Sequence, residues 1–128
     1  MFFGLTEEQE MIVETVRSFV ENEIYPHESL VEIKGFVPTE IAQDIKQKCI
    51  NLGFYACNFP ENIGGAGLNH LDFALVEREL GRGSMALTHF FGRPQNILMA
   101  CKDEQIEKYL LPAVRGELMD ALAMTEPD

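Results

Sequence analysis

The fold is set by residues 6–24, TEEQEMIVETVRSFVENEI, which begin the chain with a helical pattern. Thr6 is a good N-cap, and Gln9 three residues later completes a capping-box pattern. Apolar residues then recur every three to four positions and so share one side of a helix: Ile12, Val16, Phe19, Val20 and Ile24. This stretch predicts an amphipathic helix that ends at Pro26, because residues before proline avoid helical backbone geometry.

Two further helices are predicted after a polar linker that runs to Gly35. Pro38 suits the first turn of the second helix, where its missing N–H costs nothing, and Gly53 suits its C-terminal cap. Asn69 is the expected N-cap of the third helix, which ends at Gly81. The third helix is apolar over a wide arc, which is typical of a helix that packs against neighbours on more than one side.

The last third of the chain is less regular. Residues 84–102 suit a fourth helix, but Gly92-Arg93-Pro94 falls inside it, and an internal proline kinks or breaks a helix. Residues 103–116 suit a fifth helix, which Pro112 interrupts. Residues 120–128, DALAMTEPD, read as the opening of a strand. We therefore predict an all-α fold, an up-and-down-like bundle of about five helices with a C-terminal strand stub.

Length and composition limit the possible classes. The chain has 128 residues, of which 46% are hydrophobic, enough for one domain with a core. Its formal net charge is −11, which repels phosphate backbones and anionic lipid, so we expect no nucleic-acid partner and no membrane insertion. The N-terminus resembles neither a signal nor a transit peptide. The three cysteines cannot all pair within the chain, which favours reduced thiols and a cytoplasmic location.

No constellation of residues supports catalysis by itself. The loop Gly64-Gly65-Ala66-Gly67 lacks the lysine and the strand context of a phosphate-binding loop, so a turn between helices is favoured. The three histidines have no metal-ligand spacing, and no metal site is predicted. Glu77-Arg78-Glu79 is interpreted as a solvated helix face.

Several short motifs, taken together in order, resemble one known family. They are Leu5-Thr6-Glu7-Glu8-Gln9, Phe36-Val37-Pro38, Leu52-Gly53-Phe54, Pro60–Leu68, Glu77–Arg82, Gln105–Pro112, Gly116-Glu117-Leu118 and Met124–Asp128. Each motif is weak alone, but in this order they resemble the N-terminal domain of acyl-CoA dehydrogenases across essentially the whole chain. The resemblance implies residues 1–119 as that helical domain and residues 120–128 as the start of a middle β domain, where this chain is cut off.

The resemblance also implies an activity that the composition does not show. Proteins of this family bind FAD and oxidise an acyl-CoA to the trans-2-enoyl-CoA, usually passing electrons to an electron-transferring flavoprotein, and they are usually tetramers. The glutamate base belongs to a C-terminal domain, so no catalytic residue is expected here and the 128-residue chain is expected to be inactive alone. The acyl group and the electron acceptor are left open.

The same resemblance nominates two sets of site residues. Met124 and Thr125 are expected to contact the flavin, because the stretch Thr-Glu-Pro resembles the first flavin-contacting strand. The fourth helix is expected to wall the acyl pocket, and residues at i, i+3, i+4 and i+7 share a face. That spacing nominates Met85, Thr88, His89 and Gly92, although Gly92-Arg93-Pro94 departs from the family pattern and leaves the shape of the pocket open.

Two alternatives stay open. One is a stand-alone helical module for binding or assembly, whose terminal strand would pair with another polypeptide. The other is a domain of an acyl-CoA oxidase or a related flavoenzyme on the same scaffold.

Overall fold

The computed structural model describes residues 4–121 and 123–126, and all regular elements in these residues are helical, which confirms the all-α class. The longer elements are the α-helices α1 (Glu7–Phe19), α2 (Tyr25–Lys34), α3 (Thr39–Leu52) and α4 (His70–Leu80). The shorter elements are the π-turns η1 (Val20–Ile24) and η5 (Ile106–Leu110), the 3-10 turns η2 (Glu61–Ile63), η3 (His89–Phe91) and η4 (Asn96–Ala100), and the α-turns α5 (Met85–Thr88) and α6 (Leu111–Val114).

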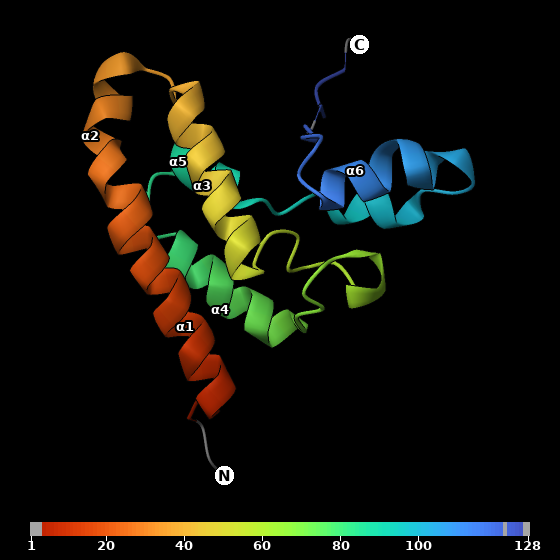
Figure 1. Cartoon of the computed structure of the whole chain (residues 1–128), viewed down its shortest axis with the longest axis horizontal. Helices are drawn as coiled ribbons and strands as arrows, with labels where there is room; N and C mark the ends of the chain where they lie inside the picture. Colours follow the sequence, from red (N-terminus) through yellow and green to blue (C-terminus); the bar gives the residue numbers. More distant parts are fainter. Residues whose placement is uncertain (1–3, 122, 127–128) are drawn as a thin grey trace.

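The first helix continues well beyond the predicted end. The capping box of Thr6 and Gln9 is present, but α1 runs through η1 into α2 as one rod (Figure 1). Pro26 lies in the first turn of α2, where a missing N–H costs nothing, and the π-turn before it absorbs the change in hydrogen bonding. The predicted stop at Pro26 and the predicted polar linker were therefore wrong, and the helix ends at Gly35 in the left-handed conformation.

The predicted boundaries of α3 and α4 agree with the structure to within one residue. Pro38, predicted in the first turn of α3, is instead its N-cap residue, and Gly53 ends that helix at φ 76° as predicted. Asn69 caps α4, because its side-chain oxygen accepts hydrogen bonds from the amides of Leu71 and Asp72. Helix α3 runs back past η1, where Nζ of Lys48 lies 2.6 Å from Glu23, and α4 packs across α1 (Figure 1).

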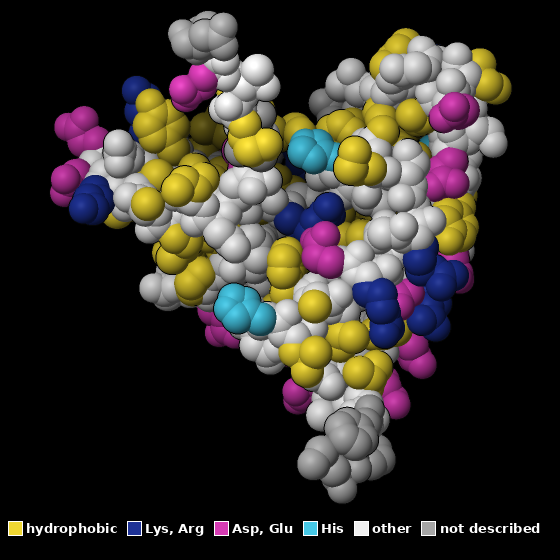
Figure 2. All heavy atoms as spheres, turned by 180° about the vertical axis from the view of Figure 1, so that it is seen from behind, with side chains coloured by type: hydrophobic (Ala, Val, Ile, Leu, Met, Phe, Trp, Pro, Cys, Tyr) yellow, Lys and Arg dark blue, Asp and Glu magenta, His cyan; other side chains and the backbone are white. Residues whose placement is uncertain are grey.

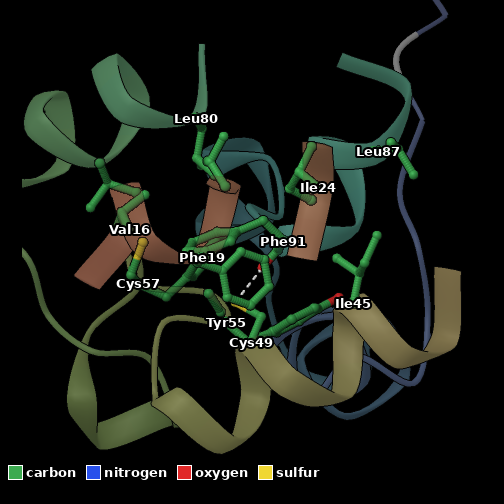
Figure 3. Packing of buried hydrophobic residues seen from close by; sticks show 14 of the residues in the cluster. Val16, Phe19, Ile24, Ile45, Cys49, Tyr55, Cys57, Leu80, Leu87 and Phe91 are labelled. Atoms are coloured by element: carbon green, nitrogen blue, oxygen red, sulfur yellow. Dashed lines mark hydrogen bonds between the residues drawn. The ribbon is translucent and has the colours of Figure 1, made fainter. Parts of the chain in front are cut away.

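The core lies where α1, α3 and α4 meet the turn η3. Phe91 is fully buried at its centre and packs edge-on against Phe19, with ring centroids 5.2 Å apart (Figure 3). The thiol of Cys49 donates a hydrogen bond of 2.8 Å to the carbonyl of Phe91. A residue from the irregular part of the chain thus completes the core of the regular helices.

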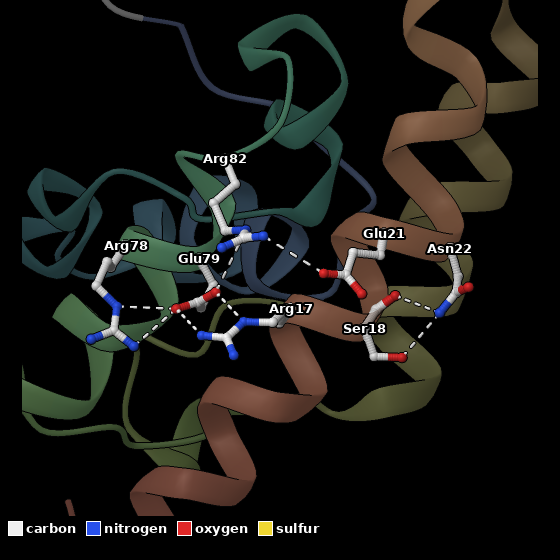
Figure 4. A network of polar contacts seen from close by, with 7 residues as sticks. All are labelled: Arg17, Ser18, Glu21, Asn22, Arg78, Glu79 and Arg82. Atoms are coloured by element: carbon white, nitrogen blue, oxygen red, sulfur yellow. Dashed lines mark hydrogen bonds and ion pairs between the residues drawn. The ribbon is translucent and has the colours of Figure 1, made fainter.

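A buried carboxylate joins α1 to α4. Glu79 is only 2% exposed, and its oxygens lie 3.0 Å from Nε of Arg17, 2.9 Å from Nη2 of Arg78 and 3.8 Å from Nε of Arg82 (Figure 4). Hydrogen bonding from Arg17 holds the pKa of Glu79 below its ordinary value. The interpretation of Glu77-Arg78-Glu79 as a solvated face was wrong for Glu79, because the helix turns it towards α1.

The predicted fourth helix forms only as the short turns α5, η3 and η4, whereas the predicted fifth helix is present, because the chain is helical without a break over residues 104–114. After Thr88 the chain tightens into η3 and then bends at Gly92, where φ is 80°. Residues 93–95 form no helix, and η4 follows. Pro112 lies in the first turn of α6 directly after the π-turn η5, so the helix passes it as the first helix passes Pro26, and the predicted interruption was wrong.

The C-terminal segment is not a strand in the described residues. Residues 120, 121 and 123–126 have no regular secondary structure. A strand requires a second strand to satisfy its backbone groups, and none is present in the described part of the chain. Residues 122, 127 and 128 of the predicted strand lie outside the described residues.

Candidate functional site

The turn after the core is shaped by the contact between Gly92 and Tyr55. A Cβ atom at Gly92 would lie 1.9 Å from Cε2 of Tyr55, so only glycine allows the ring to pack there. The opposite side of the ring faces Gly116, where a Cβ atom would lie 3.1 Å from Cζ. The amide of Ala56 donates to the carbonyl of Gly92 at 2.8 Å. Two glycines therefore hold one buried aromatic ring and fix the bend.

The bend places the side chain of Arg93 between two helical elements. Its Nε lies 2.5 Å from Oε1 of Glu77 on α4, and its Nη1 donates to the carbonyl of Thr88 at 2.9 Å. The Arg93 side chain is 21% exposed. The ion pair is thus partly shielded from water, which makes it stronger than an exposed one.

The segment after Arg93 is held by neighbours from two directions. The amide nitrogen of Asn58 donates to the carbonyl of Pro94 at 2.9 Å and to Oδ1 of Asn96 at 2.8 Å. From the C-terminal side, Oδ2 of Asp120 accepts a hydrogen bond of 2.6 Å from the backbone amide of Gln95. These bonds replace the helical bonds that the chain loses at the proline.

Two adjoining hollows lie around this segment, and we call them together the Arg93 cleft. They share His89, Arg93, Pro94 and Asp120, and the first is much the smaller of the two. The smaller is also lined by Lys46, Tyr55, Phe90, Gly92, Leu118 and Met119, and the larger by Asn58, Phe73, Glu77, Gln95, Asn96 and Ala121. Figure 2 shows the molecule notched on one face, with basic, acidic and histidine side chains in the notch.

The four predicted pocket residues do not share one face. His89 and Gly92 both line the Arg93 cleft. Met85 is 83% exposed and lines neither hollow, while Thr88 is buried against the position of Gly83. The spacing argument assumed an unbroken helix, and this premise was wrong because the helix tightens after Thr88 and bends at Gly92.

Met124 and Thr125 lie on exposed backbone beyond Asp120, and Met124 is 78% exposed. Within the described part of the chain no hydrogen bond involves either residue. Their backbone groups and the Thr125 hydroxyl are therefore open to a ligand or to further protein, and this donor and acceptor set fits the polar edge of a flavin ring.

The three glycines of the loop do not present free amides to a phosphate group. Gly64, Gly65 and Gly67 donate their backbone N–H groups to the carbonyls of Glu61, Pro60 and Phe59. A Cβ atom at Gly65 would lie 2.0 Å from the Phe59 oxygen, so this glycine serves a close backbone approach. The loop is a tight turn between helices, as the sequence favoured.

The remaining reactive groups are shielded or scattered. Burial raises the pKa of the Cys57 thiol to about 11 and that of Cys49 well above its ordinary value. In residues 4–121 and 123–126 no cluster of His, Cys, Asp or Glu could hold a metal ion. No helix in the same residues is long and apolar enough to cross a membrane.

The sequence drew attention to Gly92-Arg93-Pro94 but not to the partners of that segment. Tyr55, Glu77 and Asp120 were not nominated, although they complete the cleft. The available signal was an arginine between glycine and proline inside an apolar stretch, which indicates a charge that needs a buried partner.

A comparison with protein families assigns the domain. The family model described as "Acyl-CoA dehydrogenase, N-terminal domain" matches residues 6–117. The chain belongs to the acyl-CoA dehydrogenase family.

Curated relatives match along almost the whole chain. A 3-(aryl)acrylate reductase of Clostridium sporogenes is 35% identical over 99% of this chain and 33% of its own length. A benzylmalonyl-CoA dehydrogenase of Aromatoleum aromaticum is 32% identical over 100% of the chain and 34% of its own length. The caffeyl-CoA reductase–Etf complex subunit CarC of Acetobacterium woodii is 32% identical over 99% and 34%. The chain thus spans about a third of the length of these relatives, and no solved structure matches it significantly.

Proposed function

We propose that this chain is the N-terminal helical domain of an FAD-dependent acyl-CoA dehydrogenase, and that the Arg93 cleft contributes one wall of the acyl pocket. The observation that carries the proposal is the family match over residues 6–117. The position of the cleft supports it, because His89 and Gly92, two residues expected in the pocket wall, line that cleft.

In this proposal the domain forms one wall of the reaction site and excludes water from it. Phe73, Phe90 and Pro94 supply apolar surface to the cleft, while the Arg93–Glu77 pair lies between its helical elements. A wall that excludes water strengthens the electrostatic interactions at the reacting carbons. In this proposal no residue of the cleft is assigned as the base, which the family resemblance places in a C-terminal domain outside this sequence.

FAD, which accepts the hydride when it is bound, would be held in part by Met124 and Thr125. The support is chemical: an exposed hydroxyl and exposed backbone groups lie on a segment that has no described hydrogen-bonding partner. The flavin contact rests on the likeness of Met124-Thr125-Glu126-Pro127 to the family's first flavin strand.

The substrate is an acyl-CoA thioester, as in the names of relatives such as benzylmalonyl-CoA dehydrogenase. An electron-transferring flavoprotein is the proposed redox partner, in keeping with the relative named as a subunit of an Etf complex. A homotetramer in the cytoplasm completes the proposal. Residues outside this sequence would form the tetramer.

A second candidate function is the reverse reaction, a reduction. Two of the three relatives above are named as reductases, one of them for 3-(aryl)acrylates. The protein would then reduce the double bond of an unsaturated thioester. Phe73 lines the larger hollow of the cleft and Phe90 the smaller one, and such aromatic side chains favour contact with an aryl group.

The test uses the natural polypeptide that carries this sequence. It should be yellow when purified, and an acyl-CoA should bleach its flavin absorbance, whereas a reductase would bleach only with a reductant and recover with an unsaturated acyl-CoA. The isolated 128-residue chain should be colourless. A natural protein without flavin, or a yellow and active 128-residue chain, would contradict the proposal.

A matched pair of variants tests whether the Arg93 cleft forms a wall of the acyl pocket. His89→Ala changes an exposed side chain in the cleft, and His27→Ala changes a histidine of α2 outside it. The first should alter the ratio of kcat/KM values between short and bulky acyl-CoAs, and the second should leave that ratio unchanged. If both variants keep the wild-type ratio, the Arg93 cleft is not part of the acyl pocket.

A further inference from the structure

The segment that leads to Met124 and Thr125 has few described attachments. Gly116 accepts a hydrogen bond of 2.9 Å from Nζ of Lys46, and the amides of Glu117 and Leu118 donate to the carbonyl of Pro112. The next attachment is the 2.6 Å bond from the Gln95 amide to Asp120. Within the described residues, Asp120 is therefore the last hydrogen-bonded point before the exposed stretch at 123–126.

Asp120 is also the point where the two parts of the proposed site meet. Its partner Gln95 directly follows Gly92-Arg93-Pro94 in the wall of the Arg93 cleft. Asp120 lines both hollows of the cleft, and its carboxylate shares the smaller one with Lys46 and Arg93. A carboxylate that accepts from a backbone amide makes a charge-assisted bond, which is short and directional.

From this geometry we propose that Asp120 is a positioning residue that links the wall of the acyl pocket to the flavin-contacting segment. Its bond to Gln95 fixes where the chain leaves the helical domain, and so fixes the path of Met124 and Thr125. The inference rests on the proposed function, because it concerns the same flavin. It adds a residue that touches neither flavin nor substrate.

The test measures FAD affinity of the natural polypeptide by the change in flavin fluorescence on binding. Asp120→Ala removes the acceptor, and Gln95→Pro removes the donor at a position whose φ of −68° proline adopts. Each variant should weaken FAD binding about tenfold, the effect of losing a hydrogen bond to a charged group. Glu117→Ala removes the same charge from the same segment without this bond and should bind FAD as the wild type does.

Two comparisons separate positioning from a general loss of stability. Asp120→Asn keeps an acceptor oxygen and should recover most of the affinity. The double variant should be no weaker than either single variant, because both changes remove one bond. The unfolding midpoint of the apoprotein should move little in Asp120→Asn.

Failure of the Asp120 link can be distinguished from failure of the proposed function. Wild-type affinity in Asp120→Ala, or effects that multiply in the double variant, would overturn the link and leave the proposed function standing. If Asp120→Ala does not fold, Gln95→Pro decides the question: a tenfold weaker FAD affinity than in Glu117→Ala supports the link, and equal affinities overturn it. A wild-type protein that binds no FAD would instead overturn the proposed function, and this inference with it.

Discussion

The two halves of the domain are stabilised in different ways. Residues 7–80 contain the four long helices α1 to α4, and a buried carboxylate joins α1 to α4. Residues 85–121 form two short helical stretches, 85–91 and 104–114, and irregular backbone between and after them, which is held by single hydrogen bonds from loops and by the ring of Tyr55 between two glycines. The regular half supplies most of the core, and the irregular half adds Leu87, Phe91 and Leu110 to it and forms the hollow surface around Arg93.

This difference shows that the irregular half determines the shape of the cleft. A continuous fourth helix would have presented Met85, Thr88, His89 and Gly92 along one face. The bend at Gly92 instead separates them and brings Arg93 and Pro94 to the cleft. Irregular backbone at this point creates a recess that a straight helix would fill with its own side chains.

The largest expected effect comes from the bend itself. Gly92→Ala adds a methyl group at 1.9 Å from the Tyr55 ring on backbone with φ of 80°, so it should destabilise the chain by about 3 kcal/mol or more. Gly35→Ala, in the regular half, has φ of 72° but meets no atom within 4 Å and should cost only about 1–2 kcal/mol. Denaturant unfolding of both variants gives the difference. Equal costs would mean that the contact with Tyr55 does not matter.

The next effect concerns the link between α1 and α4. Glu79→Gln removes the charge that three guanidinium groups approach, and we expect a loss of about 2 kcal/mol in the free energy of unfolding. Glu32→Gln, on the exposed side of α2, should change it by less than about 0.5 kcal/mol. The same unfolding measurement at neutral pH checks both. If the two variants are equally stable, the buried network does not hold the regular half together.

The contribution of Glu79 should also depend on pH. Its pKa in the folded chain lies below the ordinary value of 4.5, chiefly because Arg17 hydrogen-bonds the ionised form. The stabilisation is therefore complete above pH 4.5 and is lost as the pH falls through the lowered pKa. The difference in unfolding free energy between wild type and Glu79→Gln should shrink between pH 5 and pH 3, and a constant difference would argue against an ionic link.

The smallest expected effect is a difference in the rate of thiol labelling between the two halves. Cys49 and Cys57 are buried with raised pKa values, while Cys101, after η4, is half-buried. A thiol reagent at pH 8 should label Cys101 first and should reach the other two only on unfolding, because the thiolate is the reactive form. A Cys101→Ser variant should lose the fast phase. Rapid labelling of Cys49 in that variant would show that the core opens more easily than its packing indicates.

The sequence predicted the regular half well because its signals are local. The capping box at Thr6, the αL glycine at Gly53 and the N-cap at Asn69 each act within a few residues, and each was found in the structure. The exception is Pro26, which the sequence takes as a stop. A π-turn allowed the helix to pass it, and such a turn has no simple sequence signal.

The candidate site was harder to predict because its geometry depends on distant contacts. The ring of Tyr55 determines the bend at Gly92, Glu77 determines the position of Arg93, and Asp120 holds Gln95 from 25 residues away. Spacing along the chain identifies residues on one face only when the helix is continuous. His89 and Gly92 were nominated under that assumption, and their role in an acyl pocket stays a prediction.

The assignment to an FAD-dependent enzyme is tested most directly by native mass spectrometry of the natural polypeptide that contains this sequence. The account predicts a chain roughly three times heavier than 14.5 kDa, since relatives are covered over about a third of their length, with one FAD bound to each chain. A natural product of 14.5 kDa that carries no flavin would contradict it.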